Sequence, residues 1–284
     1  MPQVEQLFKA YFNHYISVIC PSGDGDEVIE VGSPALQSHA DVLGYVRSLC
    51  DNPTLSRDDF LHTTLLKNNT TPKEREYVAG IVVNVAFMVN CTSRGSRPVK
   101  WESDQGLDGF MKQSFTAELV QITEQQEKNL TKRYGIKIRP TDNLLEHLPC
   151  NPRDRTVKAF HQTGFLKAHL ERSKNPPLDL DFQQSLKLGT LPPQLLFETL
   201  TSFHDILYPN FDRGGLGVEF VRPVTPDFTF IYWGDRLAKL HGVVKRPAPT
   251  NAFRNALTVA IIGLSLAALF GFLTLFLRAY MRTF

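Results

Sequence analysis

The stretch YGIKIRPTDNLLEHLPCNPRDRTVKAFHQTGFLKAHLERS, residues Tyr134–Ser173, has the clearest local organisation in this chain. Two short runs, Ile136–Ile138 and Val157–Phe160, combine apolar and β-branched residues between turn signals and predict short strands. Leu144–Leu148 follows a capping Thr-Asp pair and predicts a helix, and Thr163–Arg172 predicts a second helix. The segment therefore predicts a small β element embedded among helices.

A helix with two short strands also occurs in winged-helix folds, so DNA binding has to be weighed. The predicted helix contains Lys167 and Arg172, but it also contains Phe165, Leu166 and Leu170, which suit a protein core. The net charge of the whole chain is only +2, and nucleic-acid-binding domains usually carry a clearly basic stripe. We expect no nucleic-acid partner.

Helical patterns dominate on both sides of this segment. Before it, apolar spacing and capping signals predict helices over Val4–Ile19, Ser38–Cys50, a short run after Ser56, and Pro72–Val89, where Thr71 and Glu74 match a capping box. After the loop that ends at residue 106, helical patterns resume over Leu107–Tyr134, Pro193–Leu207 and Phe230–Val244. The expected organisation is an N-terminal helical region (1–95), a linker or long loop (96–106) and a second helical region with minor β structure (107–245).

The end of the chain is different in character. Ala256–Leu277, ALTVAIIGLSLAALFGFLTLFL, contains no charged residue and would extend about 33 Å as a helix, enough for a bilayer core of about 30 Å. We expect a juxtamembrane linker (246–254), a transmembrane helix (255–278) and a short tail (279–284). The predicted fold class is therefore a mostly α, water-soluble helical body with a minor β element and one C-terminal transmembrane helix.

The orientation of this span can be predicted from its flanking charges. The basic residues before the span are Arg236, Lys239, Lys245, Arg246 and Arg254, against only Arg278 and Arg282 after it. Cations favour the cytoplasmic side, and the first residues do not match a secretory signal, so we expect a tail-anchored protein with a cytosolic body. The endoplasmic reticulum and the outer mitochondrial membrane are both plausible locations. The same cations could also contact anionic lipid head groups.

Two residue types bear on this topology. Asn68, Asn69, Asn90 and Asn129 begin Asn-X-Ser/Thr triplets, which would be glycosylation candidates only if the body were lumenal. The four cysteines, Cys20, Cys50, Cys91 and Cys150, are widely spaced and form no zinc-binding pattern, and in a reducing cytosol they would remain thiols.

The predicted span has one patterned face. Gly263, Ala267 and Gly271 recur every four residues, and small residues at this spacing allow two membrane helices to approach closely. A homodimer or a partner membrane helix is one interpretation. The other is that glycine and alanine are simply frequent in membrane helices.

No motif in the chain identifies an enzyme class. The sequence lacks a nucleophile elbow, a phosphate-binding loop, a metalloprotease helix and a dinucleotide fingerprint, so we predict no cofactor, no metal and no assigned catalytic residue. The adjacent pairs Glu146-His147 and His204-Asp205 point about 100° apart on a helix and cannot form a site alone. We expect the histidines to be surface or capping residues. A pocket that gathers His161, His169 or His204 with carboxylates would favour an enzyme, and an exposed apolar groove would favour an interaction protein.

Several segments resemble a group of filamentous-fungal proteins of uncharacterised activity. They are YGIKIRPTDNLLEHL, AFHQTGFLKAHL, SLKLGTLPPQLLFETL, FHDILYP and IYWGDRLAKL. The resemblance covers residues 130–284 well and the first half loosely, and it implies a helical body with a C-terminal membrane helix but no catalytic residues. The leading hypothesis is a membrane-tethered, non-catalytic interaction or scaffold protein. The alternative is an accessory membrane protein of a fungal pathway, such as a secondary-metabolite pathway, with an unrecognised enzymatic activity.

Overall fold

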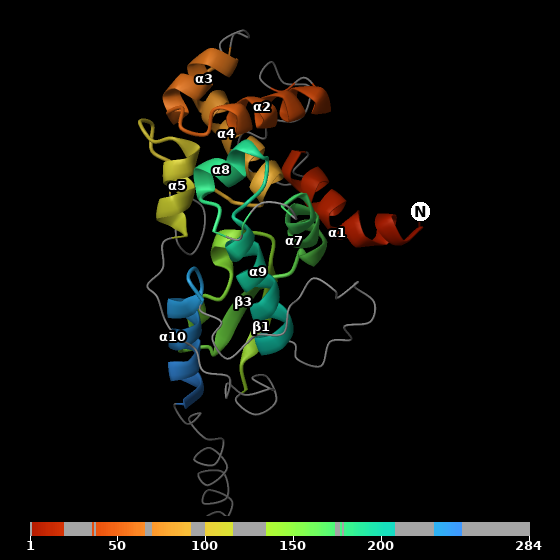
Figure 1. Ribbon diagram of the computed structural model, residues 1–284, viewed down its shortest axis with the longest axis vertical. Coiled ribbons are helices and arrows are strands. Elements are labelled where there is room, and N and C mark those ends of the chain that lie inside the picture. Colours follow the sequence, from red (N-terminus) through yellow and green to blue (C-terminus); the bar gives the residue numbers. More distant parts are fainter. Residues whose placement is uncertain are drawn as a thin grey trace, which may run out of the picture. The chain divides into compact units, whose positions relative to one another are not determined.

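The computed structural model describes residues 2–19, 36, 38–65, 70–91, 100–115, 135–173, 177, 179–207 and 230–245. The chain divides into a compact body, Met1–Val243, and a C-terminal unit, Val244–Phe284. The described part of the body is mostly helical and includes a three-stranded sheet, as the sequence predicts (Figure 1).

The first half of the body is built from helices whose starts follow their capping residues. They are α1 (Pro2–Ile19), α2 (His39–Asp51), α3 (Arg57–Leu65) and α4 (Pro72–Phe87). Ser38 and Asp41 form a capping box at α2, and Thr71 and Glu74 form the predicted capping box at α4. Helix α4 is buried along most of its length, and it ends where Met88 adopts a left-handed conformation.

The segment expected to be a linker packs closely in its described part. The backbone N–H groups of Arg57 and Asp58 donate to the carbonyls of Gln105 and Ser103, and the buried Trp101 indole donates to Gln105 O at 2.8 Å. Helix α5 (Leu107–Ser114) then begins at the expected residue. The helix predicted to continue to Tyr134 ends at Ser114, and residues 116–134 lie outside the described part of the chain.

The sheet is formed by residues 137–160. Its strands are β1 (Lys137–Thr141), β2 (Cys150–Asn151) and β3 (Thr156–Phe160), in the order β1-β3-β2. Strand β1 runs parallel to β3, beside which it is labelled in Figure 1, and β2 runs antiparallel to β3. The two predicted strands are confirmed, and β2 is an addition that the sequence did not indicate.

The prediction of a helix over Leu144–Leu148 is wrong. Only a 3-10 turn, η1 (Leu144–Glu146), forms there. Leu148 has a positive φ of 64°, and its N–H donates to Lys158 O at 2.9 Å instead of continuing a helix. Pairing with β3 therefore stops the helix after one turn.

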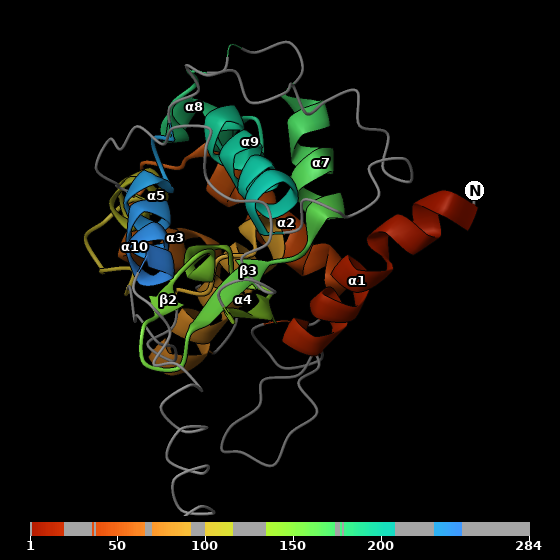
Figure 2. The same cartoon turned by 90° about the horizontal axis from the view of Figure 1, so that it is seen from below.

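The second half of the body returns to helices. They are α7 (Thr163–Arg172), α8 (Phe182–Lys187), α9 (Pro193–Thr201), the π-helix η2 (Ser202–Leu207) and α10 (Gly234–Lys245). The prediction for α7 is confirmed, and α7 lies beside α9 (Figure 2). Helix α10 begins four residues later than Phe230, after backbone N–H groups that donate to the Glu198 carboxylate.

Among the described residues, no helix is long and apolar enough to cross a membrane. The predicted transmembrane helix, residues 255–278, lies outside the residues that the structure describes.

Candidate binding site

A groove of about 550 Å³ in the body is formed by α1, α2, α4, α7 and the end of α8. We call it the basic groove. The residues that line it are Tyr11, Leu43, Val46, Arg47, Cys50, Asp51, Val85, Ala86, Phe87, Phe165, Ala168, His169, Arg172, Lys187, Leu188 and Gly189. Its volume lies within the range of about 300–1,000 Å³ that is typical of small-molecule sites.

Apolar side chains make up most of the groove wall. The Tyr11 ring is stacked with Phe165 at a centroid distance of 6.0 Å, and its hydroxyl donates to Val85 O at 3.1 Å. Leu43 and Leu188 remain 54% and 48% exposed, so apolar surface at the groove is open to water.

The charged groups of the groove are predominantly cationic. Arg47, Arg172 and Lys187 line it with a single acidic residue, Asp51, and all four are exposed. None of the three cations forms an ion pair or a side-chain hydrogen bond with another described residue. Their charges are therefore available to an anionic ligand.

A glycine with a left-handed backbone lies beside one of these cations. Gly189 has a φ of +67°, and the guanidinium of Arg172 lies 3.6 Å from the position that a Cβ at Gly189 would occupy. A left-handed backbone strongly favours glycine, because a side chain there meets the carbonyl oxygen. The turn after α8 therefore brings backbone, rather than a side chain, against Arg172.

His169 is the buried polar group of the groove. It is 8% exposed, its ring lies 4.1 Å from Phe165, and its Nδ1 atom has no hydrogen-bond partner in the described structure. Burial, together with the nearby Arg172, lowers the pKa of His169 to about 3, so the ring is neutral at pH 7. A buried imidazole nitrogen without a hydrogen-bond partner is uncommon in a folded protein core.

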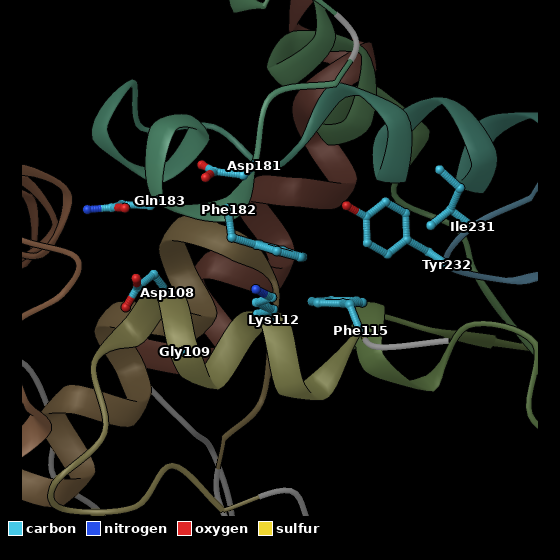
Figure 3. A pocket seen from close by; sticks show the side chains of 9 residues that line it. All are labelled: Asp108, Gly109, Lys112, Phe115, Asp181, Phe182, Gln183, Ile231 and Tyr232. Atoms are coloured by element: carbon cyan, nitrogen blue, oxygen red, sulfur yellow. The ribbon is translucent and has the colours of Figure 1, made fainter. Parts of the chain in front are cut away.

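A second cavity, of about 370 Å³, lies between α5, α8 and the segment before α10. Figure 3 shows Phe182, Phe115 and Tyr232 on one side of it and Asp108, Asp181 and Gln183 on the other. The Asp181 side chain accepts the backbone N–H of Gln184 at 2.7 Å and caps α8. The described residues that line this cavity include no histidine, cysteine or serine.

In the body, His147 and Ser202 are the pair that most resembles a catalytic base and nucleophile. Their hydrogen bonds show that the pair has a structural role. The two side chains are fully buried, with Nε2 2.6 Å from the Ser202 Oγ. Nδ1 accepts the Phe160 backbone N–H at 3.1 Å, so the proton of the neutral ring sits on Nε2 and is donated to the serine. The Ser202 hydroxyl donates in turn to Thr199 O at 2.9 Å. The histidine therefore cannot act as a base toward this serine.

A buried carboxylate sets the start of α10. Glu198 on α9 is fully buried and accepts the backbone N–H groups of Ile231, Tyr232 and Trp233 at 2.7, 2.8 and 3.1 Å. Burial raises the pKa of Glu198, while these donors and Gln194 act to lower it. Because three successive N–H groups point at this carboxylate, the helix begins at Gly234 rather than at Phe230.

Arg236 forms hydrogen bonds with the turn that contains Leu145 and His147. It was predicted as a juxtamembrane cation, and in the structure its guanidinium donates to Leu145 O at 2.7 Å and to His147 O. It also lies 4.8 Å from the Trp233 ring centroid. Lys239 pairs with Asp235 along α10 and Lys245 is the last residue of that helix, whereas Arg246 and Arg254 lie outside the described residues.

The candidate catalytic histidines do not share a pocket in the described structure. His161 faces the Asp142 carboxylate at 3.5 Å, His169 lines the basic groove, and His204 packs against the Phe203 ring. The expectation of surface or capping positions is wrong for His147, His169 and His204, which are buried.

The other predicted residues have simpler placements. Gly263, Ala267 and Gly271 lie outside the described residues, as do Asn68, Asn69 and Asn129. Asn90 follows α4, and its backbone N–H donates to the Asn143 side chain. Cys50, Cys91 and Cys150 are free thiols, and burial raises the pKa of Cys91 to about 12. Among the described residues, no cluster of His, Cys, Asp and Glu could hold a metal ion.

Sequence reasoning missed the basic groove. Arg47 and Lys187 belong to helices far apart in the chain, and no local motif links them. One signal was available, because Leu43, Val46 and Arg47 recur at helical spacing on α2 and place an arginine beside an apolar stripe.

Comparison of the chain with protein-family models, with curated proteins and with solved structures finds no significant match.

Proposed function

We propose that this protein is a membrane-tethered binding protein without a catalytic role, whose body takes an anionic, partly apolar partner in the basic groove. The observation that carries this proposal is the combination of exposed Leu43 and Leu188 with Arg47, Arg172 and Lys187, which have no ion-pair partner among the described residues, around one cavity. Apolar walls with a few placed polar groups are the usual construction of a binding site.

The chemistry of the other polar residues supports binding rather than catalysis. His147, Ser202 and Glu198, the groups best suited to acid–base or nucleophilic work, are fully buried and donate or accept within the body. A catalytic base needs contact with a substrate proton. These residues are instead used to hold α9, η1 and the start of α10 together.

The tether is proposed from the uncharged stretch Ala256–Leu277 and the basic residues before it. We propose a cytosolic body on the endoplasmic reticulum or the outer mitochondrial membrane. Membership of the fungal group with this architecture, and lateral pairing through Gly263, Ala267 and Gly271, are proposed on the same sequence grounds.

Proximity labelling tests both parts of the proposal. The full chain, fused at its N-terminus to a biotin ligase, should stay in the membrane fraction after alkaline carbonate extraction. A double variant, Arg47→Glu with Arg172→Glu, should change the set of labelled neighbours. The matched control is Arg153→Glu, an exposed arginine on the turn between β2 and β3. Release of the chain by carbonate would refute the tether. The groove would be refuted if Arg47→Glu with Arg172→Glu changed neither the labelled protein neighbours nor the anionic lipids that co-purify with the chain.

A further inference from the structure

We infer that the ligand of the basic groove is a single-chain anionic lipid, a molecule with one hydrocarbon chain and one anionic head group. This inference rests on the proposed function and names the class of molecule that the groove takes. It is drawn from the groove's size, from the separation of its apolar and charged residues, and from one buried polar side chain.

The size of the groove suits a small molecule. Its cavity measures about 550 Å³, within the range of about 300–1,000 Å³ that is typical of small-molecule sites. An extended hydrocarbon chain is narrow and can lie along the wall that Tyr11, Val85 and Phe165 form.

The charges of the groove specify the head group. Arg47, Arg172 and Lys187 outnumber Asp51, and none of the three has a partner among the described residues. Arginine side chains bind carboxylates and phosphates through paired N–H donors, whereas they offer nothing specific to a neutral head group. An anionic head would therefore be held at the cationic residues while its chain contacts the apolar wall.

His169 gives an independent indication that a polar ligand atom belongs here. Its ring is more than nine-tenths buried, it lines the groove between Phe165 and Arg172, and its Nδ1 atom has no hydrogen-bond partner in the described structure. A neutral imidazole can both donate and accept. The Nδ1 atom is itself closed to water, so the ring would have to turn to bring it to a carboxylate or phosphate oxygen beside Arg172.

Photo-crosslinking in membranes tests this inference directly. The full chain in native membranes is exposed to a fatty acid that carries a diazirine on its chain, and the crosslinked peptides are mapped by mass spectrometry. We expect crosslinks in Leu43–Cys50 of α2 and in Phe165–Arg172 of α7. Arg47→Glu combined with Lys187→Glu, two exposed positions whose change leaves the core intact, should reduce crosslinking roughly tenfold or more, since each lost charged contact is worth about that factor. Arg153→Glu should have no effect.

Parallel probes separate the head-group and chain contributions. A lysophosphatidate with the same photoreactive chain should also label the groove, and a monoacylglycerol with that chain should label it poorly. Labelling confined to Ala256–Leu277, or labelling that is insensitive to charge reversal, would overturn the inference. If an acidic amphipathic peptide binds the groove and no lipid labels it, the inference fails while the proposed binding function stands. If charge reversal changes neither the lipid labelling of the groove nor the protein neighbours in proximity labelling, both the inference and the proposed function fail.

Discussion

Acidification should destabilise the body through two buried neutral histidines. Burial, with a smaller contribution from Arg236, lowers the pKa of His147 to about 3, and burial with Arg172 lowers the pKa of His169 to about 3. The ordinary value is about 6.5. Between about pH 6.5 and about pH 3, these two histidines bind protons in the unfolded chain but not in the folded body. Stability from these groups is therefore complete above pH 6.5 and is lost as the pH falls toward 3.

The size of the effect follows from the two pKa values. Consider a histidine whose pKa is 6.5 in the unfolded chain and about 3 in the folded body. At pH 5 it lowers the free energy of unfolding by about 2 kcal/mol. The two histidines together cost about 4 kcal/mol, a large part of the 5–15 kcal/mol that stabilises a typical domain. Asp142, whose pKa is lowered to about 2 by hydrogen bonding to His14, despite an opposing effect of burial, loses its contribution only below pH 3.8.

Urea unfolding at pH 7 and pH 5, followed by tryptophan fluorescence, measures this loss. The chain has two tryptophans, Trp101 and Trp233, and both are buried in the body, so the signal of the full chain in mild detergent reports body unfolding. His147→Asn keeps an acceptor for the Phe160 N–H and removes the titrating ring. The difference in unfolding free energy between the two pH values should shrink by about 2 kcal/mol.

The matched control is His62→Asn, which changes an exposed ring on α3 that remains in water in both states. It should leave the pH dependence as in the unmodified protein. If His147→Asn retained the full dependence, the reasoning from a buried neutral imidazole would be refuted. Glu198, with its raised pKa, acts in the opposite direction and is the same in all three proteins, so it cancels in the comparison.

Three further perturbations have defined outcomes. Glu198→Ala leaves three backbone N–H groups without their acceptor and should lower the urea unfolding free energy by about 3 kcal/mol or more, with Glu198→Gln less damaging; an unchanged midpoint would contradict this. Gly189→Ala should destabilise by about 1 kcal/mol because of its positive φ, whereas Gly44→Ala in the open middle of α2 should stabilise by about as much, and thermal unfolding compares the two. Replacing Gly263 and Ala267 by Leu should weaken self-association in a membrane reporter assay, and unchanged association would exclude the small-residue face as a dimer contact.

The elements that the sequence predicts well are those decided by neighbouring residues. The capping box at Thr71 and Glu74 fixes the start of α4 wherever the helix packs, and the helix over Thr163–Arg172 has a continuous periodic pattern. The predictions that failed depend on distant partners. The helix at Leu144–Leu148 stops because Leu148 pairs with Lys158, and α10 starts late because its preceding N–H groups meet Glu198.

The same distinction explains why the histidines were misplaced. Glu146 and His147 are adjacent in the sequence, but each residue finds its partner elsewhere in the fold. Glu146 forms an ion pair with Lys158 at 2.8 Å, and His147 bonds to Ser202 on η2. Tertiary partners decide whether a histidine is a base, a cap or a buried donor, and spacing along the chain does not contain that information.

The candidate site was out of reach of the sequence for a related reason, and that reason also limits what the site can do. A groove assembled from α1, α2, α4, α7 and the end of α8 has no motif, because its residues are brought together only by folding. Within the described body, His147, Ser202 and Glu198 are used internally, while cations and leucines face outward around this groove. Arginine and lysine side chains hold an anion but stay protonated at neutral pH, so they supply charge and not a base. The measurable property of such a surface is affinity, and its dependence on salt and on the sign of the head-group charge should exceed its dependence on hydrocarbon chain length.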